Sequence, residues 1–183
     1  MDNYADSYRR YLDGDDKGLV EIIGHYRYGL TLYIGGIVGD ICLAEDIMQE
    51  VFVKLAVKKP KFGGKSSFKT WLYSVARNCA VDRLRQIARH KETPIDECFE
   101  TSDETDIEKQ YIKEEQKIEL HKAMKRLSSD YAQVLYLRYF EDFDTNEISG
   151  IMRRSKRQIG DLLYRAKKSL RTELERAGFT YED

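Results

Sequence analysis

Residues 60–89 read PKFGGKSSFKTWLYSVARNCAVDRLRQIAR, and the chain is organised around this stretch. It opens with a loop in which Gly63 and Gly64 interrupt any helix, and Ser66 or Ser67 can cap the helix that follows. Apolar residues then recur at helical spacing and predict one buried face, made of Phe68, Leu72, Val75, Ala76 and Cys79. A second face mixes cations, hydroxyls, an amide and an aromatic ring: Thr70, Ser74, Arg77 and Arg85, with Trp71 and Asn78 at its border.

The composition of this second face is poor for a surface that only contacts water, and it suits nucleic acid. Cations bind phosphate, amides read base edges, and aromatic rings stack on unpaired bases. Phe62 lies in the glycine loop just before the helix, a position that suits a strand whose bases leave the stack. An ordinary core helix, with Phe68 and Trp71 buried and a few arginines exposed, explains the same residues. The stretch alone leaves both interpretations open.

Length and composition limit the remaining possibilities. The 183 residues suffice for one or two small domains, and two prolines with little β-branched alternation predict a mostly helical chain. No apolar run is long enough to insert into a membrane and the first ten residues lack a signal-peptide core, so the cytoplasm is the expected location. Cys42, Cys79 and Cys98 have no metal-ligand spacing, and no cofactor motif occurs, so neither a metal nor a cofactor is expected.

The net charge of −1 hides an uneven distribution along the chain. Residues 1–91 carry 15 Lys and Arg against 11 Asp and Glu, and residues 111–183 carry 15 against 13. Residues 92–110 carry one Lys against eight Asp and Glu, together with Pro94 and few apolar side chains. Such a segment cannot form a core of its own and is typical of a flexible linker. Two mildly basic lobes therefore flank an acidic connector.

The first lobe is expected to hold three helices. A helix from about residue 17 to 33 is capped by Asp15 or Asp16, and Gly35, Gly36 and Gly39 are expected to loosen the chain after it. A second helix, over about 43–57, has an apolar face and a polar face that carries Glu45, Asp46, Gln49 and Glu50. That polar face is either a solvated acidic surface or a docking surface for a basic partner helix.

The second lobe carries two consecutive capping boxes. Asp144 with Glu147 predicts a short helix to about residue 152, and Ser155 with Gln158 opens a long helix to about residue 175. A short turn between two helices, the second of them cationic, is the helix-turn-helix pattern. The recognition helix would present Lys156, Arg157, Gln158, Arg165 and Lys168 to DNA. The expected fold is all-α: two small helical domains, 1–91 and 113–183, are joined by a flexible acidic linker, 92–112.

With both lobes laid out, nearly the whole chain resembles a bacterial extracytoplasmic-function sigma factor, the minimal class of sigma subunit. AEDIMQEVFVKL (residues 44–55) resembles the helix of that family that binds core RNA polymerase. KFGGKSSFKTWLYSVARNCAVDRLR (61–85) resembles the segment that melts and reads the −10-type promoter element. LSSDYAQVLYLRYFEDFDTNEIS (127–149), followed by YRAKKSL (164–170), resembles the lobe that binds the −35-type element.

The resemblance implies a role for each group of residues. Core polymerase is expected to dock on Asp46, Gln49, Glu50 and Phe52. Trp71 matches an aromatic position that supports the lobe more than it touches DNA. Promoter DNA is expected to contact Lys61, Phe62, Lys65, Ser67, Arg77 and Asn78 in the first lobe, and Lys156, Arg157, Gln158 and Arg165 in the second. The resemblance also implies that the chain is not an enzyme and that an anti-sigma protein restrains it.

The recognition helix departs from the family pattern, because Gly160 and Asp161 stand where the family commonly places a DNA-contacting cation and serine. Glycine costs about 1 kcal/mol of helix stability relative to alanine, and an aspartate repels phosphate. We therefore expect weak or unusual reading of the upstream element. Two other functions remain: a stand-alone helix-turn-helix regulator, which leaves residues 44–55 without a task, and a helical enzyme or metal protein, which the absent ligand spacing disfavours.

Overall fold

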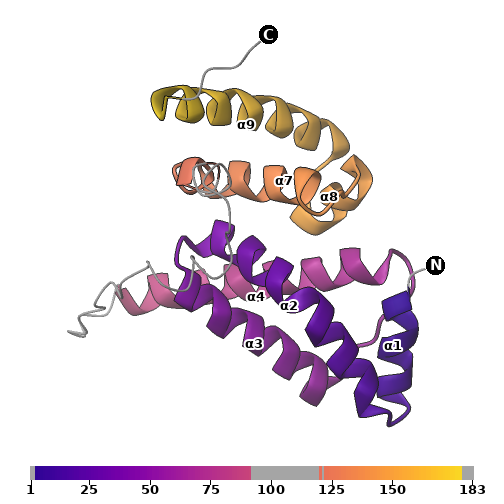
Figure 1. The fold of residues 1–183 in the computed structure, drawn as a ribbon. Coiled ribbons are helices and arrows are strands. Elements are labelled where there is room, and N and C mark those ends of the chain that lie inside the picture. The colour runs from indigo at the N-terminus through magenta and orange to yellow at the C-terminus, as the bar shows by residue number, and fades with distance from the viewer. Residues whose placement is uncertain (1–2, 92–119, 121, 179–183) are drawn as a thin grey trace.

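The computed structural model describes residues 3–91, 120 and 122–178, and within them it confirms the all-α prediction. The first lobe consists of α1 (Asn3–Leu12), α2 (Asp16–Val38), α3 (Ile41–Lys58) and α4 (Phe68–Lys91). The second consists of α7 (Ser129–Tyr139), α8 (Thr145–Met152) and α9 (Lys156–Arg176). In Figure 1 the second lobe lies above the first. The predicted acidic linker, 92–112, lies outside the described residues.

The first helix of the predicted bundle is longer than the sequence indicated. Asp15 caps α2 by accepting a hydrogen bond from the Lys17 N–H, as expected. The expectation that Gly35 and Gly36 loosen the chain was wrong, because α2 continues through both of them to Val38. Packing against neighbouring helices outweighs the low helix propensity of glycine there. The helix ends at Gly39, whose φ of 77° lies in the left-handed region that glycine adopts without strain.

Helix α1 was not predicted, and two buried tyrosines explain why it forms. Tyr8 is 1% exposed and Tyr11 is 6% exposed. The Tyr8 hydroxyl donates to the carbonyl of Pro60 at 2.8 Å, and the Tyr11 hydroxyl donates to that of Ala56 at 2.9 Å. Burial raises the pKa of Tyr8 to about 12. These contacts anchor the start of the glycine loop to the N-terminal helix, so α1 positions the loop.

The second lobe has the helix-turn-helix arrangement that the sequence predicted. Asp144 and Glu147 form the expected capping box at the start of α8, and Ser155 and Gln158 form the second at the start of α9. Between the two helices Arg153 adopts a left-handed conformation, with φ of 54°. The turn is held by Arg154, whose carbonyl accepts a hydrogen bond from Ser149 and whose guanidinium pairs with Asp130 of α7.

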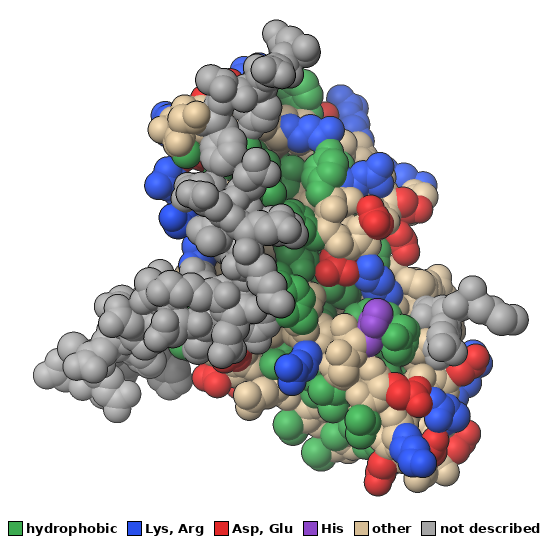
Figure 2. Space-filling view, in the orientation of Figure 1, with side chains coloured by type: hydrophobic (Ala, Val, Ile, Leu, Met, Phe, Trp, Pro, Cys, Tyr) green, Lys and Arg blue, Asp and Glu red, His purple; other side chains and the backbone are tan. Residues whose placement is uncertain are grey.

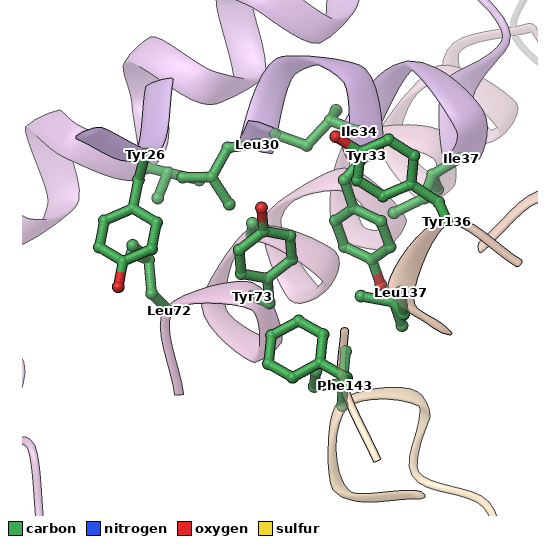
Figure 3. Close-up of a cluster of buried hydrophobic side chains, with 14 of the residues drawn as sticks. Tyr26, Leu30, Tyr33, Ile34, Ile37, Leu72, Tyr73, Tyr136, Leu137 and Phe143 are labelled. Carbon is green, nitrogen blue, oxygen red and sulfur yellow. The ribbon is translucent and has the colours of Figure 1, made fainter. Parts of the chain in front are cut away.

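The two lobes share one continuous hydrophobic core (Figure 3). Helix α7 packs on α2, and α8 packs on α4. Tyr33 of α2 lies beside Tyr73 and Tyr136, and the ring of Tyr73 meets that of Phe143 edge-on at 5.2 Å. A Cβ atom on Gly29 would lie 2.7 Å from both the Glu141 carboxylate and the Tyr73 hydroxyl. Glycine at this position therefore allows the close approach of the lobes.

Buried tyrosines at this junction predict a loss of stability at alkaline pH. Burial raises the pKa of Tyr73 and Tyr136, and the neighbouring Glu141 carboxylate raises both further. Because these tyrosines stay protonated when folded and ionise at pH about 10 when unfolded, the unfolded state binds fewer protons above that pH. Each one should then lower the free energy of unfolding by about 1.4 kcal/mol per pH unit. Melting temperatures measured on both sides of pH about 10 check this.

Two tyrosine variants separate this effect from general alkaline unfolding. Tyr136→Phe removes one titrating group from the junction, so its stability should fall less steeply with pH than that of the wild type. Tyr164→Phe is the control, because Tyr164 is 73% exposed. Equal slopes for the two variants would contradict the prediction.

None of the described helices combines the length and the apolar character that crossing a membrane requires.

Candidate nucleic-acid interface

The glycine loop presents two cations beside the start of α4. Lys61 and Lys65 are exposed, and the loop enters and turns through left-handed conformations at Lys59 and Gly64. Of the two serines that the sequence offered as caps, Ser67 performs this role, because its hydroxyl accepts from the Thr70 N–H at 3.1 Å. The predicted phosphate-binding side chains of the loop are therefore accessible, and Ser67 is partly used in capping the helix.

Phe62 is less accessible than the sequence suggested. Its ring is half-buried and lies 5.5 Å from the rings of both Phe68 and Trp71. Phe68 is fully buried, and Trp71 also contacts the ring of Tyr8 at 5.4 Å. The ordinary core interpretation therefore holds for Phe68, and Trp71 supports the loop. A base could stack only on the part of the Phe62 ring that this cluster leaves open.

The mixed face of α4, to which the sequence assigned nucleic-acid contacts, meets the second lobe. Arg77 is half-buried and donates from Nε to the side-chain oxygen of Gln133 in α7 at 3.0 Å. The Thr70 hydroxyl donates to the Glu147 carboxylate of α8 at 2.9 Å. Asn78 is also half-buried. Thr70 and Arg77 of this face thus each donate a hydrogen bond to a residue of the second lobe.

Lys69 makes three further contacts between the lobes. Its ammonium lies 2.9 Å from the Glu141 carboxylate, donates to the Glu141 carbonyl at 2.7 Å, and stands 4.8 Å above the centre of the Phe143 ring. The carboxylate, only 14% exposed, also accepts from the Tyr136 hydroxyl. Sequence reasoning missed Lys69, Gln133, Glu141 and Glu147. Nothing in the local pattern signals them, because each contact joins residues more than fifty positions apart.

The recognition helix keeps its predicted residues together on an open surface. Lys156, Arg157, Gln158 and Arg165 are all exposed on α9, while Ile159 is buried beneath them. The Gln158 side-chain oxygen accepts from the Ser155 N–H at 2.8 Å, so part of its acceptor capacity is used in capping the helix. Gly160 and Asp161 lie on the same exposed surface. Figure 2 shows lysine and arginine side chains on the surface of the second lobe, the upper one in this view.

Helix α3 presents the predicted docking residues unequally. Asp46, Gln49 and Glu50 are all exposed, and the Glu50 carboxylate also lies 3.3 Å from the Arg83 guanidinium of α4. Phe52 is only 6% exposed and packs in the core, so in this conformation its ring does not face a partner. Sequence reasoning overlooked two exposed apolar side chains at helical spacing on α3, Val53 at 58% and Val57 at 75%.

Comparisons with known proteins agree on one family. Residues 23–90 match the family model described as Sigma-70 region 2, and residues 117–170 match the one described as Sigma-70, region 4. The RNA polymerase sigma-H factor of Pseudomonas aeruginosa is 27% identical over 173 residues, covering 88% of this chain and 89% of that protein. The ECF RNA polymerase sigma factor SigX of Bacillus subtilis is 28% identical over 158 residues, covering 82% of this chain and 80% of that one.

A solved structure has the same fold. The chain of sigma factor RpoE, in its complex with the anti-sigma factor NepR from Bartonella quintana, aligns with a TM-score of 0.67 at 19% identity. The alignment covers 87% of this chain and 98% of that one. At this identity the likeness concerns the arrangement of helices alone.

Proposed function

This chain belongs to the sigma-70 family of RNA polymerase sigma factors, in its extracytoplasmic-function class, and we propose how its two lobes divide the work. Residues 1–91 dock on core polymerase and open the −10-type element, and residues 113–183 bind the −35-type element. Residues 92–112 connect them. The polymerase catalyses RNA synthesis, in the cytoplasm. This chain contributes the binding to core polymerase and to promoter DNA.

The exposed stripe of α3 is the observation that carries the docking proposal. Asp46 and Gln49 project from α3 together with Val53 and Val57, and an acidic, partly apolar surface suits a basic helix of the polymerase. We leave Phe52 out of the contact set in this conformation, because its ring is in the core. Glu50 stays in the contact set, because its side chain is 50% exposed although it pairs with Arg83.

DNA binding follows from the charges of the loop and of α9. Lys61 and Lys65 bind phosphate beside α4, where Asn78 reads a base of the opened strand. Lys156 and Arg157 bind phosphate or base edges at the N-terminus of α9, with Arg165 farther along the helix. An anti-sigma protein is the restraining partner we propose for this chain, and the structure of RpoE from Bartonella quintana is a complex with the anti-sigma factor NepR.

Co-elution with bacterial core RNA polymerase on a sizing column tests this function. The wild-type chain should co-elute stoichiometrically, and the double variant Asp46→Arg with Gln49→Ala should not, because it places a cation in the acidic stripe. Asp13→Arg is the control, because Asp13 is exposed in the turn between α1 and α2. Failure of the folded wild-type chain to bind active core would favour a stand-alone helix-turn-helix regulator.

A further inference from the structure

The chain enters the glycine loop through a turn whose backbone conformation is unusual. Lys59, the residue that follows α3, has φ of 43° and ψ of 55°, in the left-handed region. Residues with a Cβ atom rarely adopt this conformation, and it persists only where the surrounding structure holds it. Because the loop follows at once, this turn sets the direction in which Lys61, Phe62 and Lys65 leave α3.

Two tyrosines of α1 hold the turn from both of its sides. The Tyr11 hydroxyl donates to the carbonyl of Ala56 at 2.9 Å, and this carbonyl lies in the last turn of α3, where carbonyls have no partner within the helix. The Tyr8 hydroxyl donates to the carbonyl of Pro60 at 2.8 Å, directly after the turn. The ammonium of Lys59 itself stands 4.7 Å from the centre of the Tyr11 ring.

The same tyrosines share their packing with the aromatic residue of the loop. The ring of Tyr8 lies 5.4 Å from the rings of Phe68 and Trp71. The ring of Phe62 lies 5.5 Å from those same two rings. Phe62 is thus held against α4 by a cluster to which α1 contributes, while Tyr8 fixes the backbone two residues before it.

Helix α1 is itself firmly placed on the bundle. A Cβ atom on Gly18 of α2 would collide with the Ser7 carbonyl oxygen, so the two helices approach closely there. The Ser7 hydroxyl donates to the Glu21 carboxylate of α2 at 2.7 Å, and Arg10 pairs with the same carboxylate. Figure 1 shows α1 beside the segment that joins α3 to α4. The tyrosine hydroxyls therefore extend from a fixed support.

We propose that Tyr8 and Tyr11 are positioning residues for promoter opening, because their hydroxyls latch the turn at Lys59 and aim the loop at the opened strand. This rests on the proposed function, in which the loop binds that strand. Both rings are buried, so the tyrosines act through the loop and not by contact with DNA. A loop fixed before the strand arrives loses less conformational freedom on binding, and the latch thereby strengthens strand capture.

The experiment removes the two hydroxyls and keeps the rings. Tyr8→Phe, Tyr11→Phe and the double variant lose the hydrogen bonds to Pro60 and Ala56 and retain the aromatic packing. Tyr4→Phe is the matched control, because Tyr4 belongs to the same helix, is half-buried, and stacks on His25 of α2 at 4.4 Å.

The position of the loop has a spectroscopic signature in the free chain. Trp71 is the only tryptophan of the sequence, and Phe62 of the loop packs on its ring. Acrylamide quenching of tryptophan fluorescence, measured well below the melting temperature of each variant, therefore reports how well the loop shields Trp71. We expect stronger quenching in the double variant and wild-type quenching in Tyr4→Phe. A loss of global stability alone would leave quenching of the folded chain unchanged.

The holoenzymes are then compared on promoters selected from a random library by the wild type. A hydrogen bond of ordinary net strength corresponds to about 2- to 12-fold in an equilibrium constant, so each single variant should lower promoter opening by about that factor. The double variant should lower it further. Permanganate reactivity of unpaired thymines measures opening. Binding of a duplex fragment with the −35-type element alone should not change, because the second lobe binds it, and co-elution with core polymerase should not change either.

Three results would overturn the proposal. The first is equal quenching of the double variant and the wild type, which would show that the hydroxyls do not hold the loop. The second is increased quenching with unchanged opening, which would show that the held position does not matter for the strand. The third is an equal loss of opening in Tyr4→Phe. Failure of the wild type to bind core would instead refute the sigma function, and the proposed role in opening would fall with it.

Discussion

Replacing Phe143 by alanine is expected to lower the free energy of unfolding by about 3–5 kcal/mol, the usual cost of truncating a buried phenylalanine. The ring is 2% exposed, contacts Tyr73 of the first lobe edge-on at 5.2 Å, and lies beneath the Lys69 ammonium. Because the residue belongs to the second lobe and its ring packs on the first, the truncation leaves a cavity where the lobes meet. Urea denaturation followed by circular dichroism measures the change.

Phe140→Ala is the matched control, since Phe140 precedes Phe143 by three residues, is 50% exposed, and stacks on Tyr136 at 5.1 Å. We expect it to cost about 1 kcal/mol or less, because a half-exposed ring gains little from burial. The Phe143→Ala chain should also unfold in two steps where the wild type unfolds in one, because the shared core no longer couples the lobes. Equal losses for the two variants would show that the junction is not closed in solution.

Local patterns predicted most of the helices, because capping and helical periodicity depend on neighbours in the chain. Both capping boxes of the second lobe form as the residues indicated. Helix α1 escaped prediction because its stability comes from Tyr8 and Tyr11, whose hydroxyls bond to carbonyls more than forty residues away. Gly35 and Gly36 misled the prediction for the same reason, since tertiary packing keeps them helical.

The candidate site was predictable to the extent that a residue's role depends on its own chemistry. The cations of the loop and of α9 are exposed, as their charge suggests. The closed junction was not predictable, because Lys69 and Glu141 are ordinary surface residues in the sequence and acquire a shared role only when α4 and the segment before α8 meet. Phe52 is the opposite case. Its position in the motif suggested a contact with polymerase, but the fold places its ring in the core.

Removing the Asn78 side chain should lower promoter opening by about 5- to 150-fold, because a side-chain contact to a base is worth about 1–3 kcal/mol. Phe62→Ala should have an effect of the same order through the loss of stacking. Neither should alter co-elution with core polymerase, since neither residue belongs to the exposed stripe of α3 formed by Asp46, Gln49, Val53 and Val57. Permanganate reactivity of unpaired thymines measures opening, on promoters selected from a random library by the wild-type holoenzyme.

Phe62→Ala and Asn78→Ala are expected to differ in their effect on the stability of the free chain. This difference separates a role in reading DNA from a role in supporting the loop. Phe62 packs on Phe68 and Trp71, so Phe62→Ala should also lower the melting temperature of the free chain. Asn78→Ala should leave the melting temperature nearly unchanged, because the residue lies half-exposed on the helix surface. Loss of opening in Asn78→Ala without loss of stability would assign that side chain to the DNA strand. Loss of polymerase binding in both variants would refute the division of labour between α3 and α4, because two substitutions outside the docking stripe would then control docking.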